Sequence, residues 1–238
     1  MNTDELLAQY EATGDEEVFR EARRLYEQAL AALPDDADVH MNYGYLIECH
    51  ARNQLRQAAA HYERAIELNP KEIKAHYHLI GARAGLRESE IPIALYDRRL
   101  AASPDDLDAY HLLAAAYLAG HQYEKARRVI EAGLALAPDD PQLIENRGDV
   151  RAGTDDPEGA LADWRRSREF DPETLSSVYS SAFLLQREGR LTEAMDAWRT
   201  IIDWSETRGY SLETVWPKQE LERLRRETAN ETGEPPAR

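Results

Sequence analysis

Residues 110–138 read YHLLAAAYLAGHQYEKARRVIEAGLALAP, and this stretch decides the fold. Its first part, 110–117, and the later residues Ala126, Ile130 and Gly133 each place small and large apolar side chains on one face of a helix. Pro138 then closes the unit, because proline cannot continue a helix. The stretch therefore predicts two helices that pack closely on each other.

The closing proline recurs at a nearly fixed spacing along the chain. The prolines are Pro34, Pro70, Pro104, Pro138 and Pro172, and they are 36, 34, 34 and 34 residues apart. A 34-residue period with a proline at the end of each unit is typical of a repeat built from two helices and two turns. We attribute the longer first spacing to a two-residue insertion around Arg52-Asn53, between the two helices expected in that unit.

A small–large–small pattern stands in register with these prolines. The small residue twelve positions before the proline is Ala22, Ala58, Pro92, Ala126 or Ala160, and Ala194 continues the series. The large residue eight positions before it is Tyr26, Tyr62, Tyr96, Ile130 or Trp164, and then Trp198. A small residue also marks the first helix of four units, at Gly44, Ala114, Gly148 and Ala182. Small residues let two helices approach, and the large one fills the gap between them. A second small residue is expected five positions before the proline, as at Ala65 and Gly133. In the third unit, Pro92 and Arg99 stand at the two small positions, so that pair is expected to pack less closely.

With these residues in register, the chain resembles a tetratricopeptide repeat (TPR) protein over about residues 3–206. The resemblance implies an all-α, right-handed α-solenoid of about six helix pairs, with twelve antiparallel helices and no strand. The repeats expected are 3–36, 37–72, 73–106, 107–140, 141–174 and 175–206. A capping helix is expected within 207–227, running from Glu213 to Glu227, with Leu212, Val215, Trp216, Leu221 and Leu224 on its apolar side. Residues 228–238 lack apolar periodicity and are expected to form a flexible tail.

Composition excludes several classes of ligand. The 238 residues carry 29 Lys and Arg against 45 Asp and Glu, a formal charge of −16, which disfavours nucleic acid and anionic membranes. No run approaches the roughly 18 apolar residues of a membrane span, and Met1–Glu5 lacks the layout of a signal peptide. The single cysteine, Cys49, excludes an intrachain disulfide. We therefore expect a cytoplasmic protein.

The resemblance also implies a binding surface. In TPR superhelices the first helices of the repeats line a concave groove that holds extended peptides or partner helices. The residues of this chain at groove positions include Met41, Asn42, Tyr45, Lys74, Tyr77, His78, Asp108, His111, Glu145, Asp149, Tyr179 and Phe183. Aromatic, Met and His side chains suit a contact surface, and the carboxylates favour a basic or amphipathic protein segment. The alternative is that the rings only pack between adjacent first helices.

Other site hypotheses are weaker. Some TPR domains grip a C-terminal carboxylate, and the residues at those positions here are Leu7, Glu11, Asn42, Lys74 and His78. Only Asn42 and Lys74 match, and Glu11 has the wrong sign for a carboxylate ligand. His40 and His76 stand at a packing position, His-Glu-x-x-His is missing from the sequence, and neighbours such as Cys49 and His50 diverge on a helix. The sequence therefore predicts no metal site, no cofactor and no catalytic residue.

We interpret the protein as a soluble scaffold or adaptor that binds a partner peptide or helix in the groove. One alternative is a regulatory or substrate-recruiting subunit of an enzyme complex, and another is an enzyme that uses histidines, Cys49 and groove carboxylates. The four tryptophans, Trp164, Trp198, Trp204 and Trp216, fall in the last third of the chain. They are expected to build the C-terminal core, with self-association through this third as the alternative.

Overall fold

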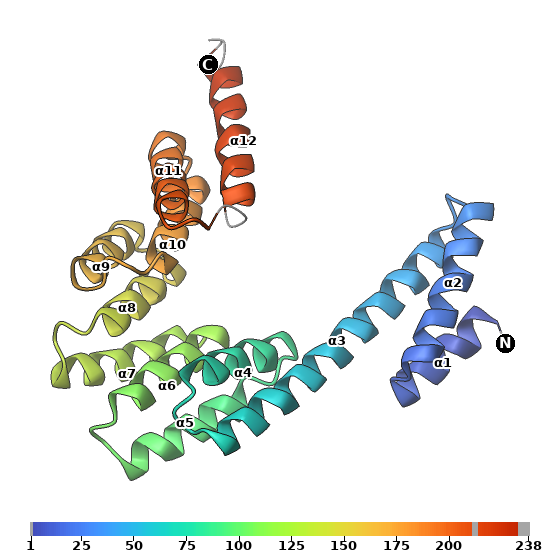
Figure 1. Ribbon diagram of the computed structural model, residues 1–238, viewed down its shortest axis with the longest axis horizontal. Helices are drawn as coiled ribbons and strands as arrows, with labels where there is room; N and C mark the ends of the chain where they lie inside the picture. Colours follow the sequence, from blue (N-terminus) through green and yellow to red (C-terminus); the bar gives the residue numbers. More distant parts are fainter. Residues whose placement is uncertain (1, 211–213, 233–238) are drawn as a thin grey trace. The chain divides into compact units, whose positions relative to one another are not determined.

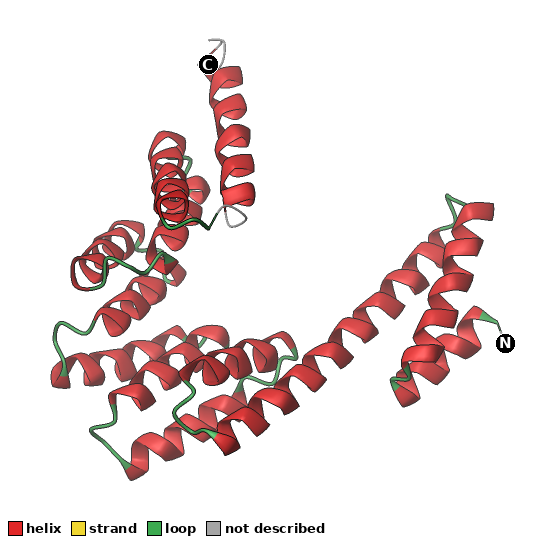
Figure 2. Ribbon diagram, viewed as in Figure 1, coloured by secondary structure: helices red, strands yellow, loops and turns green. Residues whose placement is uncertain are grey.

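The computed structural model describes residues 2–210 and 214–232 (Figures 1 and 2). That part of the chain forms twelve helices and contains no strand, so the predicted all-α class is confirmed. The helices are α1 (Thr3–Thr13), α2 (Glu16–Ala32), α3 (Ala37–Leu68), α4 (Ile73–Gly85), α5 (Glu90–Ala102), α6 (Leu107–Ala119), α7 (Tyr123–Leu136), α8 (Pro141–Gly153), α9 (Pro157–Phe170), α10 (Ser176–Arg187), α11 (Leu191–Thr207) and α12 (Val215–Thr232). They divide into two compact units, Met1–Leu95 and Tyr96–Arg238.

A recurring contact fixes the turn before several first helices. The ring of His40 lies 2.8 Å from the Pro34 carbonyl oxygen, and that of His76 lies 3.0 Å from the Pro70 oxygen. Tyr110 donates its hydroxyl to the carbonyl of Pro104 at 3.0 Å, again six residues earlier. The two histidines therefore hold turns in place, which agrees with their packing position in the sequence.

In the unit Tyr96–Arg238 the small–large–small faces are buried between paired helices. α6 pairs with α7, α8 with α9, and α10 with α11. The small residues of the second helices are fully buried at Ala126, Ala160 and Ala194, as are the large side chains of Ile130 and Trp198. Trp164 is 3% exposed. The predicted face is confirmed for these three pairs.

The last helix, α12, packs against α11 through Leu221 and Leu224, which join the same buried cluster as Trp198. Val215 and Trp216 were expected on the apolar side, but about half of each side chain is exposed. Because α12 continues to Thr232, the tail predicted from residue 228 is wrong for 228–232. Residues 233–238 of that tail lie outside the described residues, as do Leu212 and Glu213.

In the unit Met1–Leu95, one helix replaces a predicted helix pair. α3 runs unbroken through Arg52-Asn53, where a turn was expected, so residues 3–206 hold eleven described helices instead of twelve (Figure 1). The segment 51–56, ARNQLR, contains neither glycine nor proline, and Arg52 forms an i,i+4 ion pair with Glu48. Local helix propensity thus carries the helix across the expected turn.

The two halves of α3 pack on different neighbours. The first half closes a cluster with α1 and α2, in which Leu6, Tyr10, Tyr26 and Leu46 are almost fully buried. The second half packs on α4 through a separate cluster built on Ala59, Leu79 and Ala82. The hydrophobic core of this unit is therefore divided along the length of one helix.

Candidate partner-binding surface on α8, α9 and α10

A hollow of about 330 Å³ opens on the unit Tyr96–Arg238 between three helices. Its lining residues are Asp149 and Ala152 of α8, Trp164 of α9, and Ser180, Phe183, Leu184 and Arg187 of α10. Two of them, Asp149 and Phe183, are predicted groove residues. The walls are mostly apolar, with one carboxylate and one guanidinium.

The sequence of α8 explains how the carboxylate reaches this hollow. Glu145 and Asp149 are four residues apart, so they project from one face of the helix. Gly148 lets Trp164 lie directly against α8, because a Cβ at residue 148 would come within 2.6 Å of the indole. The Trp164 indole then donates Nε1–H to Asp149 Oδ1 at 3.0 Å and fixes the carboxylate at the hollow.

Both carboxyl groups on this face are held in an unfavourable environment. Glu145 is only 6% exposed, and burial raises its pKa. Burial is also the main cause that raises the pKa of Asp149, with the Glu145 charge adding to it, to about 6. Next to them, Asn146 is 4% exposed, and its Nδ2 has no hydrogen-bond partner among the described residues. A positive charge beside Asp149 would lower the pKa of this carboxyl group again, because an opposite charge favours the ionised form.

An aromatic cluster borders the hollow. Phe183 is 51% exposed, and its ring centroid lies 5.4 Å from that of Trp198 and 5.6 Å from that of Trp216. Tyr179, the other predicted groove residue of α10, stacks on Trp216 at 6.5 Å. Trp216 comes from α12 and was expected on the apolar side of the capping helix, so sequence reasoning missed its place on this surface. An exposed aromatic cluster beside a carboxylate suits contact with another protein.

The predicted groove residues of α6 are engaged in local contacts. His111 Nε2 lies 2.9 Å from Asp140 Oδ1, the carboxylate that also accepts from the Leu143 N–H at the start of α8. Asp108 is exposed and lies 3.7 Å from the Arg99 guanidinium. His111 therefore has a structural contact, and Asp108 is an exposed carboxylate beside Arg99.

In the unit Met1–Leu95, the structure does not bring the remaining predicted residues together. Met41, Asn42 and Tyr45 lie on the first half of α3, whereas Lys74, Tyr77 and His78 lie on α4 beside its second half. His78 stacks on Tyr62 at 5.2 Å, and Tyr62 is about 25 Å along the helix axis from Tyr45 at 1.5 Å per residue. The straight α3 separates the two sets.

The Tyr45 hydroxyl is hydrogen-bonded within the unit. It donates to Glu11 Oε1 at 2.5 Å, and this bond is the main cause that raises the pKa of Tyr45 to about 12. Glu11 stands at one position of the carboxylate grip considered above, where it is held by Tyr45. Beside Cys49, the His50 ring stacks on Phe19 at 3.7 Å and lies 2.9 Å from the Tyr10 hydroxyl. His50 is thus a packing residue.

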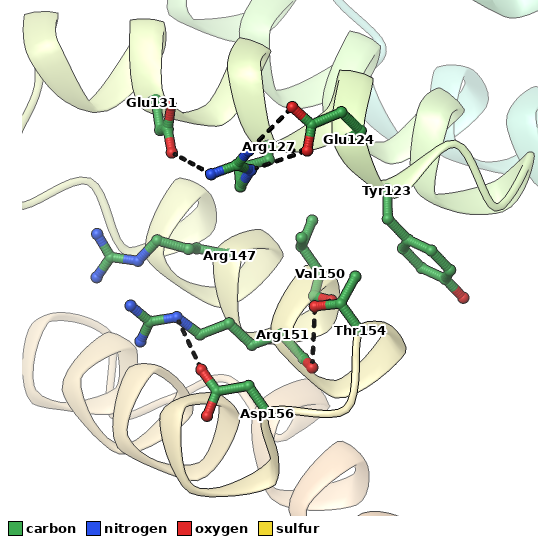
Figure 3. A pocket seen from close by; sticks show the side chains of 9 residues that line it. All are labelled: Tyr123, Glu124, Arg127, Glu131, Arg147, Val150, Arg151, Thr154 and Asp156. Atoms are coloured by element: carbon green, nitrogen blue, oxygen red, sulfur yellow. Dashed lines mark hydrogen bonds and ion pairs between the residues drawn. The ribbon is translucent and has the colours of Figure 1, made fainter.

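A larger pocket, of about 440 Å³, lies between α7, α8 and the turn after α8 (Figure 3). No predicted site residue lines it. Arg127 pairs there with Glu124 at 2.8 Å, and Arg147 and Arg151 both reach the buried Asp163, at 2.6 and 2.8 Å. Because each of these three arginines already has a carboxylate partner, we interpret this pocket as a structural ion-pair network.

The described residues contain neither a metal-binding cluster nor a membrane-spanning helix. In the parts 2–210 and 214–232, no group of three or more His, Cys, Asp or Glu side chains is arranged to hold a metal ion. None of the helices described there is both long and apolar enough to cross a membrane.

Paired helices that bury small–large–small faces, with an open surface on the first helices, define a helical-repeat scaffold. Two tetratricopeptide repeat models match the sequence, one over residues 15–48 and one over residues 93–144. Together with the fold, these matches show that the chain is a tetratricopeptide repeat protein. This fold supports a scaffold for protein interactions, and TPR proteins bind protein or peptide partners.

Solved structures agree on the fold. A thermophilic TPR protein of Thermus thermophilus is 22% identical with a TM-score of 0.57, over 74% of this chain and 94% of that one. The Cut9–Hcn1 hetero-tetramer of APC/C contains a chain that is 11% identical with a TM-score of 0.52. That match covers 88% of this chain but 42% of the other. A comparison with curated proteins gave no match.

Proposed function

We propose that the protein is a scaffold or adaptor, without catalytic activity of its own, that holds a basic segment of a partner protein on the α8–α10 surface. The observation that carries the proposal is the hollow beside Asp149, where a carboxylate of raised pKa meets an apolar wall. Folding does not require this carboxylate, since an ionised group in a poorly solvated place destabilises a protein. A binding role explains why it is there.

The hollow suits the shape of a Lys or Arg side chain. Such a side chain has an apolar stem and a charged head, so it can cover apolar surface while its head meets a carboxylate. The stem would lie along Phe183 and Leu184, and the head would reach Asp149. An arginine would also lie beside the Trp164 ring, where cation–π attraction adds to the contact.

Charge and the aromatic border support the same class of partner. The net charge of −16 attracts a basic segment and repels an acidic one before contact. An apolar residue near the basic one in the partner could pack on the exposed Phe183 and Trp216 rings. We therefore expect a motif with one cation and one nearby apolar side chain. Arg187, which also lines the hollow, disfavours a motif with two adjacent cations.

A peptide selection tests this proposal and does not require the partner to be identified first. A random peptide library displayed on phage is selected on the full chain at pH 7.5, and one enriched peptide is synthesised for titration calorimetry. We expect enrichment of Arg or Lys beside an apolar residue. We also expect Asp149→Asn to weaken binding about tenfold, which corresponds to about 1.4 kcal/mol.

The exposed Asp108→Asn variant is the matched control, because it removes the same charge from a first helix outside the hollow. An enriched peptide without a cation, or equal losses for both variants, would contradict a specific site at Asp149.

A further inference from the structure

In the structure the two helices predicted for the second repeat, 37–72, form one straight helix. The two faces that would pack together in a closed repeat are therefore uncovered. Gly44 on the first half of α3 is exposed, and a Cβ built there would meet nothing within 4 Å. Ala58, Tyr62 and Ala65 on the second half are only half-buried. The matching positions in the paired repeats are buried, at Ala114, Ala126, Ile130, Gly133, Gly148, Ala160, Trp164, Ala182, Ala194 and Trp198.

The sequence also has a residue suited to a turn at the position where this repeat would close. In four other repeats the residue five positions before the small residue of the second helix adopts a left-handed conformation. These residues are Arg87 (φ 61°), His121 (φ 55°), Asp155 (φ 64°) and Gly189 (φ 72°). The corresponding residue, five before Ala58, is Asn53. After glycine, asparagine is among the residues that enter this region most readily. Asn53 can therefore serve either in a helix or in a turn.

The paired repeats show what belongs on the open face. Trp164 lies against Gly148, at the position that matches Gly44, and Tyr62 is the residue that matches Trp164. In the next repeat Phe183 meets Trp198 at 5.4 Å, and the matching pair here is Tyr45 with Tyr62. The face around Gly44 is thus shaped for the Ala58–Tyr62–Ala65 face of this same sequence.

Within one chain the straight helix keeps these two faces apart. Gly44 and Tyr62 are 18 residues apart on α3, or about 27 Å along its axis. The open surface includes Met41 at 62% exposure and Ile47 at 49%. It is continuous with a packed interface, because Leu55 and Tyr62 already border the core between α3 and α4.

We propose that a second copy of the chain covers this surface in a helix-exchanged dimer. The first half of α3 of each copy packs on the second half of α3 of the other, so the repeat contact forms twice about a two-fold axis. Each contact replaces the one that a closed hairpin would make within a single chain. The interface lies in the N-terminal unit, and the proposal is independent of the α8–α10 surface.

Single-cysteine variants test whether the contact forms between copies. In a Cys49→Ser background, Gly44→Cys and Ala58→Cys are prepared separately, refolded together and oxidised. In this mixture no chain carries both cysteines, so a disulfide between the two positions can form only between different copies. We expect a covalent dimer in the mixture and much less of it with either variant alone. If the mixture gives no dimer while the double variant forms an intrachain disulfide, the repeat closes within one chain and the proposal is wrong.

Substitutions at the hinge give a second test that needs no oxidation. Light scattering after size exclusion gives the mass, with 27.1 kDa for one chain and twice that for the dimer. Asn53→Ala favours the straight helix, and we expect it to keep the dimer. Asn53→Gly favours the turn and should weaken the dimer about 30-fold relative to Asn53→Ala, since the lower helix propensity of glycine acts once in each chain.

Circular dichroism checks that both hinge variants remain helical. A monomer at every concentration for the unsubstituted chain and for Asn53→Ala would overturn the proposal. Equal dimer stability in both hinge variants would show that any dimer forms without exchange across Asn53.

Discussion

Replacement of Asp149 by asparagine should stabilise the protein at neutral pH. Asparagine has the same shape, and its Oδ1 can still accept the hydrogen bond from Trp164, so the change removes the charge and keeps that hydrogen bond. The environment raises the pKa of Asp149 from its usual 3.8 to about 6. A shift of about two units corresponds to about 3 kcal/mol of destabilisation when the group is ionised. Because Asp149 is half-buried, solvent screening reduces this figure, and we expect about 1–2 kcal/mol.

The pH dependence follows from the sign of the shift. The pKa of the folded state lies above that of the unfolded state, so the folded state holds the proton more tightly between pH 4 and 6, about the two pKa values. The destabilising effect of Asp149 is therefore absent below about pH 4 and complete above about pH 6. Glu145, one turn away on α8, also has a pKa that burial raises, so its ionisation destabilises the folded state in the same direction.

The assay is urea unfolding, followed by circular dichroism, of the unsubstituted chain and of Asp149→Asn at several pH values from 7.5 to 5. We expect the variant to be more stable at pH 7.5 and the difference to shrink at pH 5. Asp108→Asn is the control, and it should change stability by no more than about 0.5 kcal/mol. A variant that is less stable than the unsubstituted chain by the same amount at every pH would refute the reasoning.

The remaining predictions concern packing, and each is measured by denaturant unfolding. Ala126→Leu should cost about 1–3 kcal/mol, because Ala126 is fully buried where α6 and α7 meet; unchanged stability would show that these helices do not approach there. Gly148→Ala should destabilise despite the better helix propensity of alanine, since its Cβ would come within 2.6 Å of Trp164; a gain of about 1 kcal/mol would mean that the indole lies elsewhere. Trp216→Ala should cost about 1 kcal/mol through lost ring contacts with Phe183 and leave helicity unchanged, and no loss would place α12 off this surface.

The fold could be predicted because each repeat is stabilised mainly by its own helix pair and its neighbours. The positions of Ala126, Ile130 and Pro138 are local signals, and nearest-neighbour packing lets such signals specify the architecture. The same reasoning placed Asp149 and Phe183 on one surface, since groove positions recur with the repeat.

The straight α3 could not be predicted from this pattern. Gly44, Ala58 and Tyr62 carry the repeat signature whether the helices fold back on each other or run on. The difference lies in a few residues around Asn53, where the helix propensities of ordinary residues span only about 0.7 kcal/mol per residue. The repeat pattern at the packing face says nothing about which of these two states is lower in free energy.

The raised pKa of Asp149 and the position of Trp216 could not be predicted from the sequence either. The raised pKa of Asp149 depends on burial by α9 and α10 and on the Glu145 charge one turn away. Trp216 reaches the surface from a helix outside the predicted repeats. Both features arise from contacts between elements that no single repeat contains.

The most direct test of the proposed function is a double-mutant cycle between Asp149 and the basic residue of a selected peptide. Affinities are measured by calorimetry at pH 7.5 for the unsubstituted chain and for Asp149→Asn, each with the arginine peptide and with the same peptide carrying neutral citrulline. If the arginine lies beside Asp149, the coupling energy should be about 1–2 kcal/mol. Either single change should then weaken binding by most of this amount. A coupling energy near zero, with both peptides binding the two proteins in the same ratio, would contradict the account.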